Sequence, residues 1–346
     1  MPPSPAWSRL DDAKLLDRRF CDLKLAVDGS LRTRVDQLYA ELAARGLTRL
    51  RPHVWVSTEW FSPDGIPGIA LPFFLAHPRL TRLERSQMLA VEGGTPAACL
   101  RILRHEAGHC FDTAYRLHRR KPYRELFGRY GDPYPDTYKP RPGSRRYVTH
   151  LPGWYAQAHP AEDFAETFAV WLGSRKAWRA RYRGWPALRK LEYVDRLMSE
   201  LAAQRSAPPV RSRRTPEALT GNRTTLREHY REKKLLYADE FPDFYDADLL
   251  KLFSADPKSA DHAGTAPPSA AAFLRKIRPA LRRDVSRWTG AYAYTIDQVL
   301  GDMIDRSKEL KLRLAIDPVQ AEADARMMVT VQTMNYLHAG HRPVAL

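Results

Sequence analysis

The sequence predicts an α+β fold, in which a first domain over residues 1–205 combines a small mixed sheet with helices and residues 206–346 form a mainly helical extension. Two observations favour it. Strand-like apolar runs lie in the first part of the chain, whereas apolar residues at three- and four-residue steps dominate the second. With 346 residues, 44% hydrophobic and 28% charged, the chain can bury a core without disulfides, which excludes fibrous and wholly disordered classes.

Charge and cysteine content limit the class of protein further. A net charge of +16 is enough to attract nucleic acid, anionic lipid or an acidic protein. The three cysteines form no CxxC pair, which excludes a disulfide framework and a cysteine zinc finger and fits a reducing compartment. We find no apolar run of signal-peptide length and none near the roughly 20 residues that span a bilayer. We therefore expect a soluble, cytoplasmic protein with no membrane partner. The sequence does not tell which oligomeric state the protein adopts.

Strand and helix patterns alternate at the start of the chain. Alternating apolar residues over 21–29 (CDLKLAVDG) predict a strand that ends in a turn. Apolar residues at helical spacing over 31–45, followed by Gly46, predict the first helix. The β-like runs at 53–61 and 68–78 are joined by a Pro- and Gly-rich segment, so we expect an antiparallel hairpin.

The middle of the chain predicts two helices separated by a loop. The run CLRILRHEAGHCFDTAYRL indicates a helix over about 97–118, with Thr95 as a possible cap before Pro96. The stretch 121–153 is rich in Pro, Gly, Tyr and Arg and predicts an ordered loop or lid. The next helix is expected to start near His159.

Helical patterns predominate beyond Trp178. The Pro- and Arg-containing stretch 206–217 is the expected domain boundary, and a flexible linker is expected near 254–271. Helices of the extension are predicted over 226–241, 293–310 and 323–337.

The central helix carries His105, Glu106 and His109 in the pattern HEAGH. Residues four apart in a helix leave the same face, so both imidazoles can hold one metal ion while Glu106 can reach a metal-bound water. The alternative is a helix whose two histidines are satisfied by other partners.

A catalytic zinc site needs a third protein ligand, and HPAEDFAETF offers one. Glu162 and Glu166 lie four apart on one helical face, with Phe164 and Phe168 on another. Glu162 could bind zinc, and Glu166 could accept a hydrogen bond from the far nitrogen of a ligating histidine. The alternative is a surface helix that carries a few acids.

Four other residues invite weaker interpretations. His150 or His159 could replace Glu162 as third ligand, although His159 precedes a proline and is expected to cap or lead into the helix. Asp112 could orient a ligand or be an ordinary polar helix position. Cys110 points about 100 degrees away from its neighbour His109, so we expect it to pack in the core.

The motifs HEAGH and EDFAE resemble those of the gluzincin class of zinc metallopeptidases. The likeness is to bacterial zinc-binding metallopeptidases and, more distantly, to the lethal factor type of protease, which pair a HExxH helix with a later E-[DF]-[WF]-A-E helix. The resemblance covers roughly residues 20–200 and implies a zincin-like catalytic domain. It implies Zn²⁺ held by His105, His109 and Glu162, with Glu106 as general base and Glu166 supporting a ligand.

The resemblance also draws attention to Tyr155. This residue lies seven positions before Glu162, the offset at which lethal factor-type enzymes carry a tyrosine beside the metal. Its hydroxyl is therefore a candidate oxyanion donor. A packing role is the alternative, since Tyr147 also precedes the helix.

The functional prediction is a zinc-dependent hydrolase that cleaves peptide bonds in a peptide or protein substrate, with a zinc-bound water activated by Glu106. One alternative is a basic protein that binds nucleic acid or another polyanion through stretches such as LREHYREKKLLY and RSRR. Acids are mixed with these bases and no recognised nucleic-acid motif accompanies them, so a solvated helical face is the better account. Another alternative is a zinc site that hydrolyses nothing.

Overall fold

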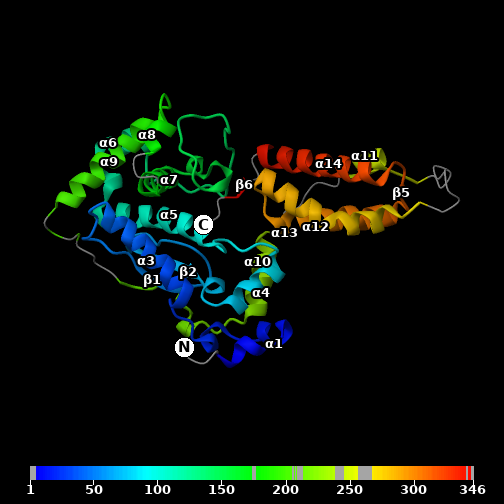
Figure 1. The fold of residues 1–346 in the computed structure, drawn as a ribbon, viewed down its shortest axis with the longest axis horizontal. Coiled ribbons are helices and arrows are strands. Elements are labelled where there is room, and N and C mark those ends of the chain that lie inside the picture. The colour runs from blue at the N-terminus through cyan, green and yellow to red at the C-terminus, as the bar shows by residue number, and fades with distance from the viewer. Residues whose placement is uncertain are drawn as a thin grey trace. The chain divides into compact units, whose positions relative to one another are not determined.

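The computed structural model divides the chain into two compact units (Figure 1). The first comprises Met1–Gln87, Val91–His229 and Arg342–Leu346, and the second comprises Met88–Ala90 and Tyr230–His341. The structure describes residues 5–173, 177–204, 206, 208, 213–237, 245–255, 267–339 and 342–343.

The first unit extends beyond position 205, where a boundary was expected. The indole Nε1 of Trp55 donates to the carbonyl of Pro216 at 2.9 Å, and the hydroxyl of Ser57 donates to the carbonyl of Glu217 at 2.9 Å. The end of the Pro- and Arg-rich stretch therefore packs against this unit, and the division falls after His229.

Helix α5 is the centre of the first unit. It packs against α3 and α7, and α7 packs in turn against α9. The α-helices from the start of the chain to the end of α9 are α1 (Asp12–Leu16), α2 (Phe20–Leu23), α3 (Gly29–Ala44), α4 (Pro78–Met88), α5 (Pro96–Tyr115), α6 (Lys121–Phe127), α7 (Pro160–Gly173), α8 (Ala177–Arg181) and α9 (Ala187–Ala203). The first helix, the central helix and the helix near His159 are thus confirmed as α3, α5 and α7.

The backbones of α5 and α7 approach closely at Gly108. A Cβ atom built at this position would lie 2.8 Å from the Cα atom of Ala165, a separation that side chains do not tolerate. Glycine is thus required in the middle of α5 because it lets the two helices pack backbone against backbone.

The predicted antiparallel hairpin is wrong. Strands β1 (His53–Ser57) and β2 (Gly68–Pro72) pair in parallel, with His53 opposite Gly68. The connection is long enough for the chain to reverse before β2, and Phe61 forms an antiparallel bridge with Ala70 on the way. The antiparallel partner of β2 is therefore the connection itself.

The predicted strand over 21–29 is also wrong. Residues up to Leu23 form α2, and Lys24 adopts a left-handed conformation with a φ of 48° that ends the helix. The amide of Phe20 donates to the carbonyl of Thr224 at 3.1 Å and that of Cys21 to the carbonyl of Asn222 at 2.9 Å. A distant segment of the chain thus satisfies the backbone that a sheet would otherwise have paired.

The expected loop over 121–153 is ordered and contains regular structure. It begins with α6 and includes β3 (Thr137–Tyr138), which pairs antiparallel with β6 (Arg342–Pro343). The remainder, up to the 3₁₀ turn at Pro152–Gln157, connects α6 to α7.

The second unit is helical around its own apolar core. Its core includes Leu274, Leu281, Leu300 and Met303. Its elements are α11 (Tyr245–Leu252), α12 (Ala270–Thr289), α13 (Ala293–Glu309), α14 (Pro318–Ala339) and the antiparallel strands β4 (Phe253–Ser254) and β5 (Arg313–Leu314), while α10 (Leu226–Leu236) crosses the division between the units.

Three of these helices were predicted, whereas α11 and α12 were not. The expected linker over 254–271 is shorter than predicted at its end, because Ser269 caps α12 by accepting from the amide of Ala272 at 3.2 Å. Residues 256–266 of that linker lie outside the described residues. No helix in the described part of the chain combines the length and the apolar character needed to cross a membrane.

The close approach at Gly108 makes a substitution there costly. In Gly108→Ala the new methyl group must push α5 away from α7, so we expect metal-free protein to lose about 1–3 kcal/mol of unfolding free energy, measured by urea denaturation. Gly143→Ala is the matched control, since a Cβ there meets nothing within 4 Å. Equal stability of the two variants would contradict this packing.

Candidate metal centre

Helix α5 has well-defined ends and presents two histidines on one face. Thr95 caps it by accepting from the amide of Ala98 at 3.2 Å, and Pro96 occupies the first turn. The helix ends at Arg116, whose φ of 51° is left-handed. Between these ends His105 and His109 lie one turn apart, as predicted.

Helix α7 supplies the carboxylates. Every residue from Ala161 to Leu172 is buried, so this helix is enclosed by protein on all sides. Glu162 and Glu166 lie on the face of α7 that meets α5, and only 4% and 0% of their surfaces are exposed. A surface helix with a few acids is therefore excluded.

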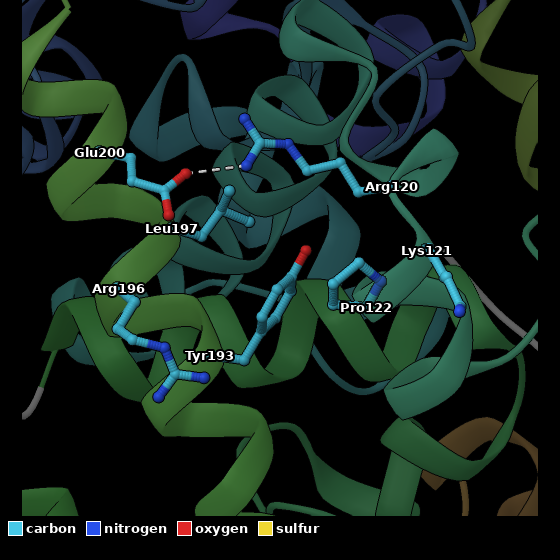
Figure 2. Close-up of a pocket in the computed structure, with 7 residues that line it drawn as sticks. All are labelled: Arg120, Lys121, Pro122, Tyr193, Arg196, Leu197 and Glu200. Carbon is cyan, nitrogen blue, oxygen red and sulfur yellow. Dashed lines mark hydrogen bonds and ion pairs between the residues drawn. The ribbon is translucent and has the colours of Figure 1, made fainter.

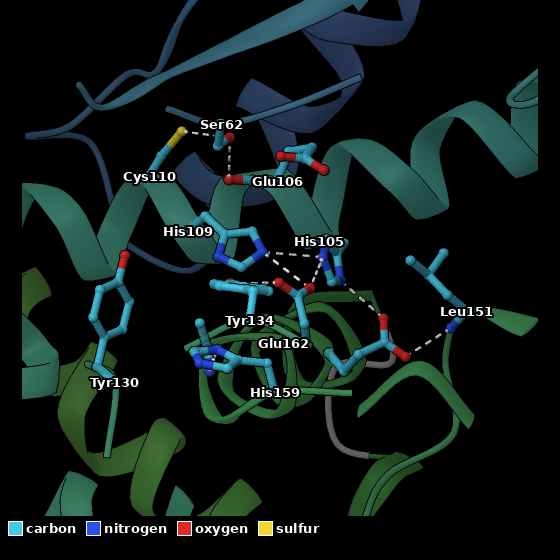
Figure 3. A network of polar contacts seen from close by, with 12 residues as sticks. Ser62, His105, Glu106, His109, Cys110, Tyr130, Tyr134, Leu151, His159 and Glu162 are labelled. Carbon is cyan, nitrogen blue, oxygen red and sulfur yellow. Dashed lines mark hydrogen bonds and ion pairs between the residues drawn. The ribbon is translucent and has the colours of Figure 1, made fainter. Parts of the chain in front are cut away.

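Three ligand atoms from the two helices converge on one point (Figure 3). The Oε2 atom of Glu162 lies 3.0 Å from Nε2 of His105 and 3.3 Å from Nε2 of His109. The two Nε2 atoms lie 3.1 Å apart. Ligand atoms about 2.0–2.1 Å from a tetrahedral zinc ion are separated by about 3.3 Å, so these spacings fit one zinc ion.

Glu162 provides a test of whether a cation belongs here. Its Oε2 atom is buried and has no hydrogen-bond partner within the described chain, although two imidazole nitrogens lie near it. Buried carboxylate oxygens are rarely left without a partner. Atoms that are close together but not aligned as hydrogen bonds are expected of ligands directed at a common ion.

Glu166 fixes the orientation of the first histidine. Nδ1 of His105 donates to Oε1 of Glu166 at 2.9 Å, and both side chains are fully buried. The second oxygen of Glu166 accepts from the amide of Leu151 at 2.9 Å. An imidazole that donates from Nδ1 presents the lone pair of Nε2, which is the tautomer that a metal requires.

The charges at the centre favour a cation. Burial disfavours the charged form of His105, but the facing carboxylates of Glu162 and Glu166 outweigh burial and raise its pKa to about 10. Burial likewise disfavours the Glu162 carboxylate, but the facing His109 and His105 hold its pKa well below the usual range. The buried carboxylates of Glu162 and Glu166 are therefore stabilised by positive charge beside them.

A cavity of about 330 Å³ opens beside the three ligand atoms. Glu106, His109 and Glu162 line it, whereas His105 lies behind them with no exposed surface. Glu106 is thus placed beside the second histidine at the wall where a substrate would enter. The other lining residues are Phe61, Ser62, Pro63, Asp64, Thr113, Tyr130 and Tyr134.

Sequence reasoning missed Tyr134. Its hydroxyl donates to Oε1 of Glu162 at 2.8 Å, and its ring stacks on His159 with centroids 3.8 Å apart. The hydrogen bond occupies one oxygen of Glu162 and leaves the other facing the histidines. The only signal in the sequence was that Tyr134 belongs to the tyrosine-rich stretch expected to form a loop or lid.

Tyr155 lies next to the first histidine. The ring centroids of Tyr155 and His105 are 5.7 Å apart, and Tyr155 is 5% exposed. Burial and then the negative charge of Glu162 raise the pKa of its hydroxyl well above the usual value. The hydroxyl is therefore expected to stay protonated and able to donate.

The remaining candidates lie outside the centre. Nε2 of His150 donates to the carbonyl of Arg101 at 2.9 Å. His159 donates to the carbonyl of Asp132 at 2.8 Å and accepts from the amide of Ala161 at 3.1 Å, so it caps α7. Neither histidine belongs to the converging group of ligand atoms.

Two neighbours in α5 also serve other contacts. Asp112 accepts from the amide of His118 at 2.7 Å rather than orienting a ligand. Cys110 is buried, with its sulfur 3.6 Å from the hydroxyl of Ser62. That hydroxyl donates to the backbone carbonyl of Glu106 at 3.2 Å and so ties α5 to the connection between the strands.

Comparison with known families agrees with this geometry. Residues 97–183 match the family described as "Putative zinc-binding metallo-peptidase". The matched segment contains α7 and all of α5 except its first residue. No curated protein and no solved structure matches the chain. The segment is therefore similar to zinc-binding metallopeptidases, and the chain holds a candidate metal site within it.

The role of Glu166 can be measured through metal affinity. Glu166→Gln keeps the shape but removes the charge that accepts from His105, so we expect zinc affinity to fall about 10- to 100-fold in competition with a chelator. Glu125→Gln is the control, because Glu125 is exposed and its ion pair among the described residues is with Lys121, at 3.8 Å. Unchanged affinity in Glu166→Gln would contradict the role.

Tyr134→Phe tests the hydrogen bond to Glu162. Without the hydroxyl the carboxylate can turn, so we expect weaker zinc binding, by about twofold to tenfold, and an altered visible spectrum of the cobalt-substituted protein. Tyr130→Phe is the control, because its hydroxyl donates to Asp64 rather than to a candidate ligand. Identical spectra in Tyr134→Phe and wild type would refute the positioning role.

Proposed function

We propose that this protein is a zinc-dependent peptidase of the gluzincin type, with a zincin-like catalytic domain in which His105, His109 and Glu162 hold the ion. The observation that carries the proposal is the convergence of their ligand atoms, 3.0–3.3 Å apart, at the wall of a cavity. The match of residues 97–183 to zinc-binding metallopeptidases supports it independently.

The residues around the cavity suit the hydrolysis of an amide. A bound zinc ion would polarise the substrate carbonyl and bring the pKa of a coordinated water towards neutrality. Glu106, at the cavity wall, takes the proton of the attacking water and delivers it to the leaving amine. Glu166 keeps His105 in one tautomer throughout, because its second oxygen is itself held by Leu151.

The developing oxyanion needs a donor, and Tyr155 is our candidate. It lies beside His105, and its hydroxyl is protonated over the whole physiological pH range because burial and Glu162 raise its pKa. A donor held beside the reacting carbonyl would stabilise the oxyanion charge without reorganisation.

The substrate we propose is a peptide or protein, because peptide hydrolysis is what an open position beside a zinc ion and a general base most simply perform. A reducing cytoplasm is the proposed location. The free thiols of Cys21, Cys99 and Cys110 support it.

The decisive variants separate metal binding from catalysis. We expect His105→Ala and Glu162→Ala to lose zinc, and Glu106→Gln to keep about one zinc per chain while turnover falls about 10²- to 10⁴-fold. Metal analysis together with digestion of an unbiased peptide library measures both properties. Removal of zinc by a chelator should abolish wild-type cleavage, and restoring zinc should recover it.

Two results would contradict the proposal in different ways. Full zinc content in Glu162→Ala would remove that residue from the ligand set. If wild type and Glu106→Gln both bind zinc and neither cleaves any peptide, a zinc site that hydrolyses nothing would be favoured.

A further inference from the structure

We call the cavity of about 330 Å³ beside the three ligand atoms the metal-site cavity. A second cavity, of about 690 Å³, adjoins it, since Tyr130 lines both. We call it the basic cavity. Its lining residues are His118, Arg119, Arg124, Arg129, Tyr130, Gly131 and Asp132.

The three arginines of the basic cavity have no carboxylate partner within the described residues. Arg119, Arg124 and Arg129 are all exposed, and no ion pair involves them there. Arginines elsewhere in this unit do find partners: Arg104 pairs with Glu41 at 2.6 Å. Three unpaired guanidinium groups around one cavity repel one another and attract an anion.

Tyr130 is a fixed wall between the two cavities. Its ring stacks on His118 with centroids 4.3 Å apart, and its hydroxyl donates to Asp64 across the metal-site cavity. His118 is held in turn by Asp112, whose carboxylate lies 3.1 Å from its Nδ1 atom. The basic cavity therefore lies next to the metal-site cavity, with Tyr130 between them.

We propose that the basic cavity binds an acidic side chain of the substrate, so that the substrate class is peptides with Asp or Glu a few residues from the cleaved bond. This inference rests on the proposed peptidase function. Guanidinium groups bind carboxylates with paired, charge-assisted hydrogen bonds, which gives the cavity a preference for acids over neutral polar groups. The single acid in its lining, Asp132, leaves a positive excess.

A third cavity provides the matched control (Figure 2). It also carries basic residues, among them Arg120 and Arg196, but Glu200 pairs with Arg120 at 2.9 Å. It shares no lining residue with the metal-site cavity. Arg196→Ala therefore removes an exposed positive charge of the same unit without touching the path past Tyr130.

Binding is measured on the full chain with zinc bound and Glu106→Gln as the parent, so that no peptide is cleaved. The probe is a fluorescein-labelled peptide of alternating Glu and Ala, and the same peptide with Lys in place of Glu is the reference. We expect the acidic probe to bind more tightly. Arg124→Ala should weaken it about two- to fivefold, and the combined Arg119, Arg124 and Arg129→Ala variant about tenfold or more. Added salt should reduce these differences.

Three results distinguish the inference from the function on which it rests. A combined variant that loses no more affinity than Arg196→Ala would overturn the basic cavity as an acid-binding site. Cleavage of library peptides by wild type with no enrichment of Asp or Glu near the cleaved bond would overturn the substrate class and leave the peptidase standing. Selective binding of the acidic probe, together with no cleavage of any library peptide by zinc-loaded wild type, would uphold the basic cavity and overturn the peptidase.

Discussion

The contact between Gly108 and Ala165 is the constraint on which the rest of the centre depends. A carboxylate of α7 can meet the imidazoles of α5 only if the two helix backbones lie unusually close, and the absence of a side chain at Gly108 allows that approach. The same glycine stands between His105 and His109 in the sequence. The motif therefore encodes the ligands together with the packing that brings the third ligand to them.

Burial and charge act together around α7. Glu162 faces the histidines, while its neighbour Asp163 points to α9 and pairs with Lys190 at 2.5 Å. The ammonium group of Lys190 also lies 4.4 Å from the centre of the Tyr147 ring. One side of α7 is thus anchored by a buried ion pair. On the other side, Oε2 of Glu162 has no hydrogen-bond partner among the described residues and can bind a cation.

Local geometry explains what could be predicted from the sequence. The face shared by His105 and His109, and the face shared by Glu162 and Glu166, follow from helical spacing alone. Tyr134 could not be found in this way, because its contact with Glu162 spans 28 residues across an aperiodic loop. Strand direction was also hidden, since alternation of apolar residues is the same for parallel and antiparallel pairing.

Crystallography with anomalous scattering at the zinc edge tests the central claim most directly. We expect one strong peak within coordination distance of Nε2 of His105, Nε2 of His109 and Oε2 of Glu162 in zinc-loaded protein, and the loss of that peak in Glu162→Ala. A peak bound by other side chains, or one that persists at full height without the Glu162 carboxylate, would contradict it.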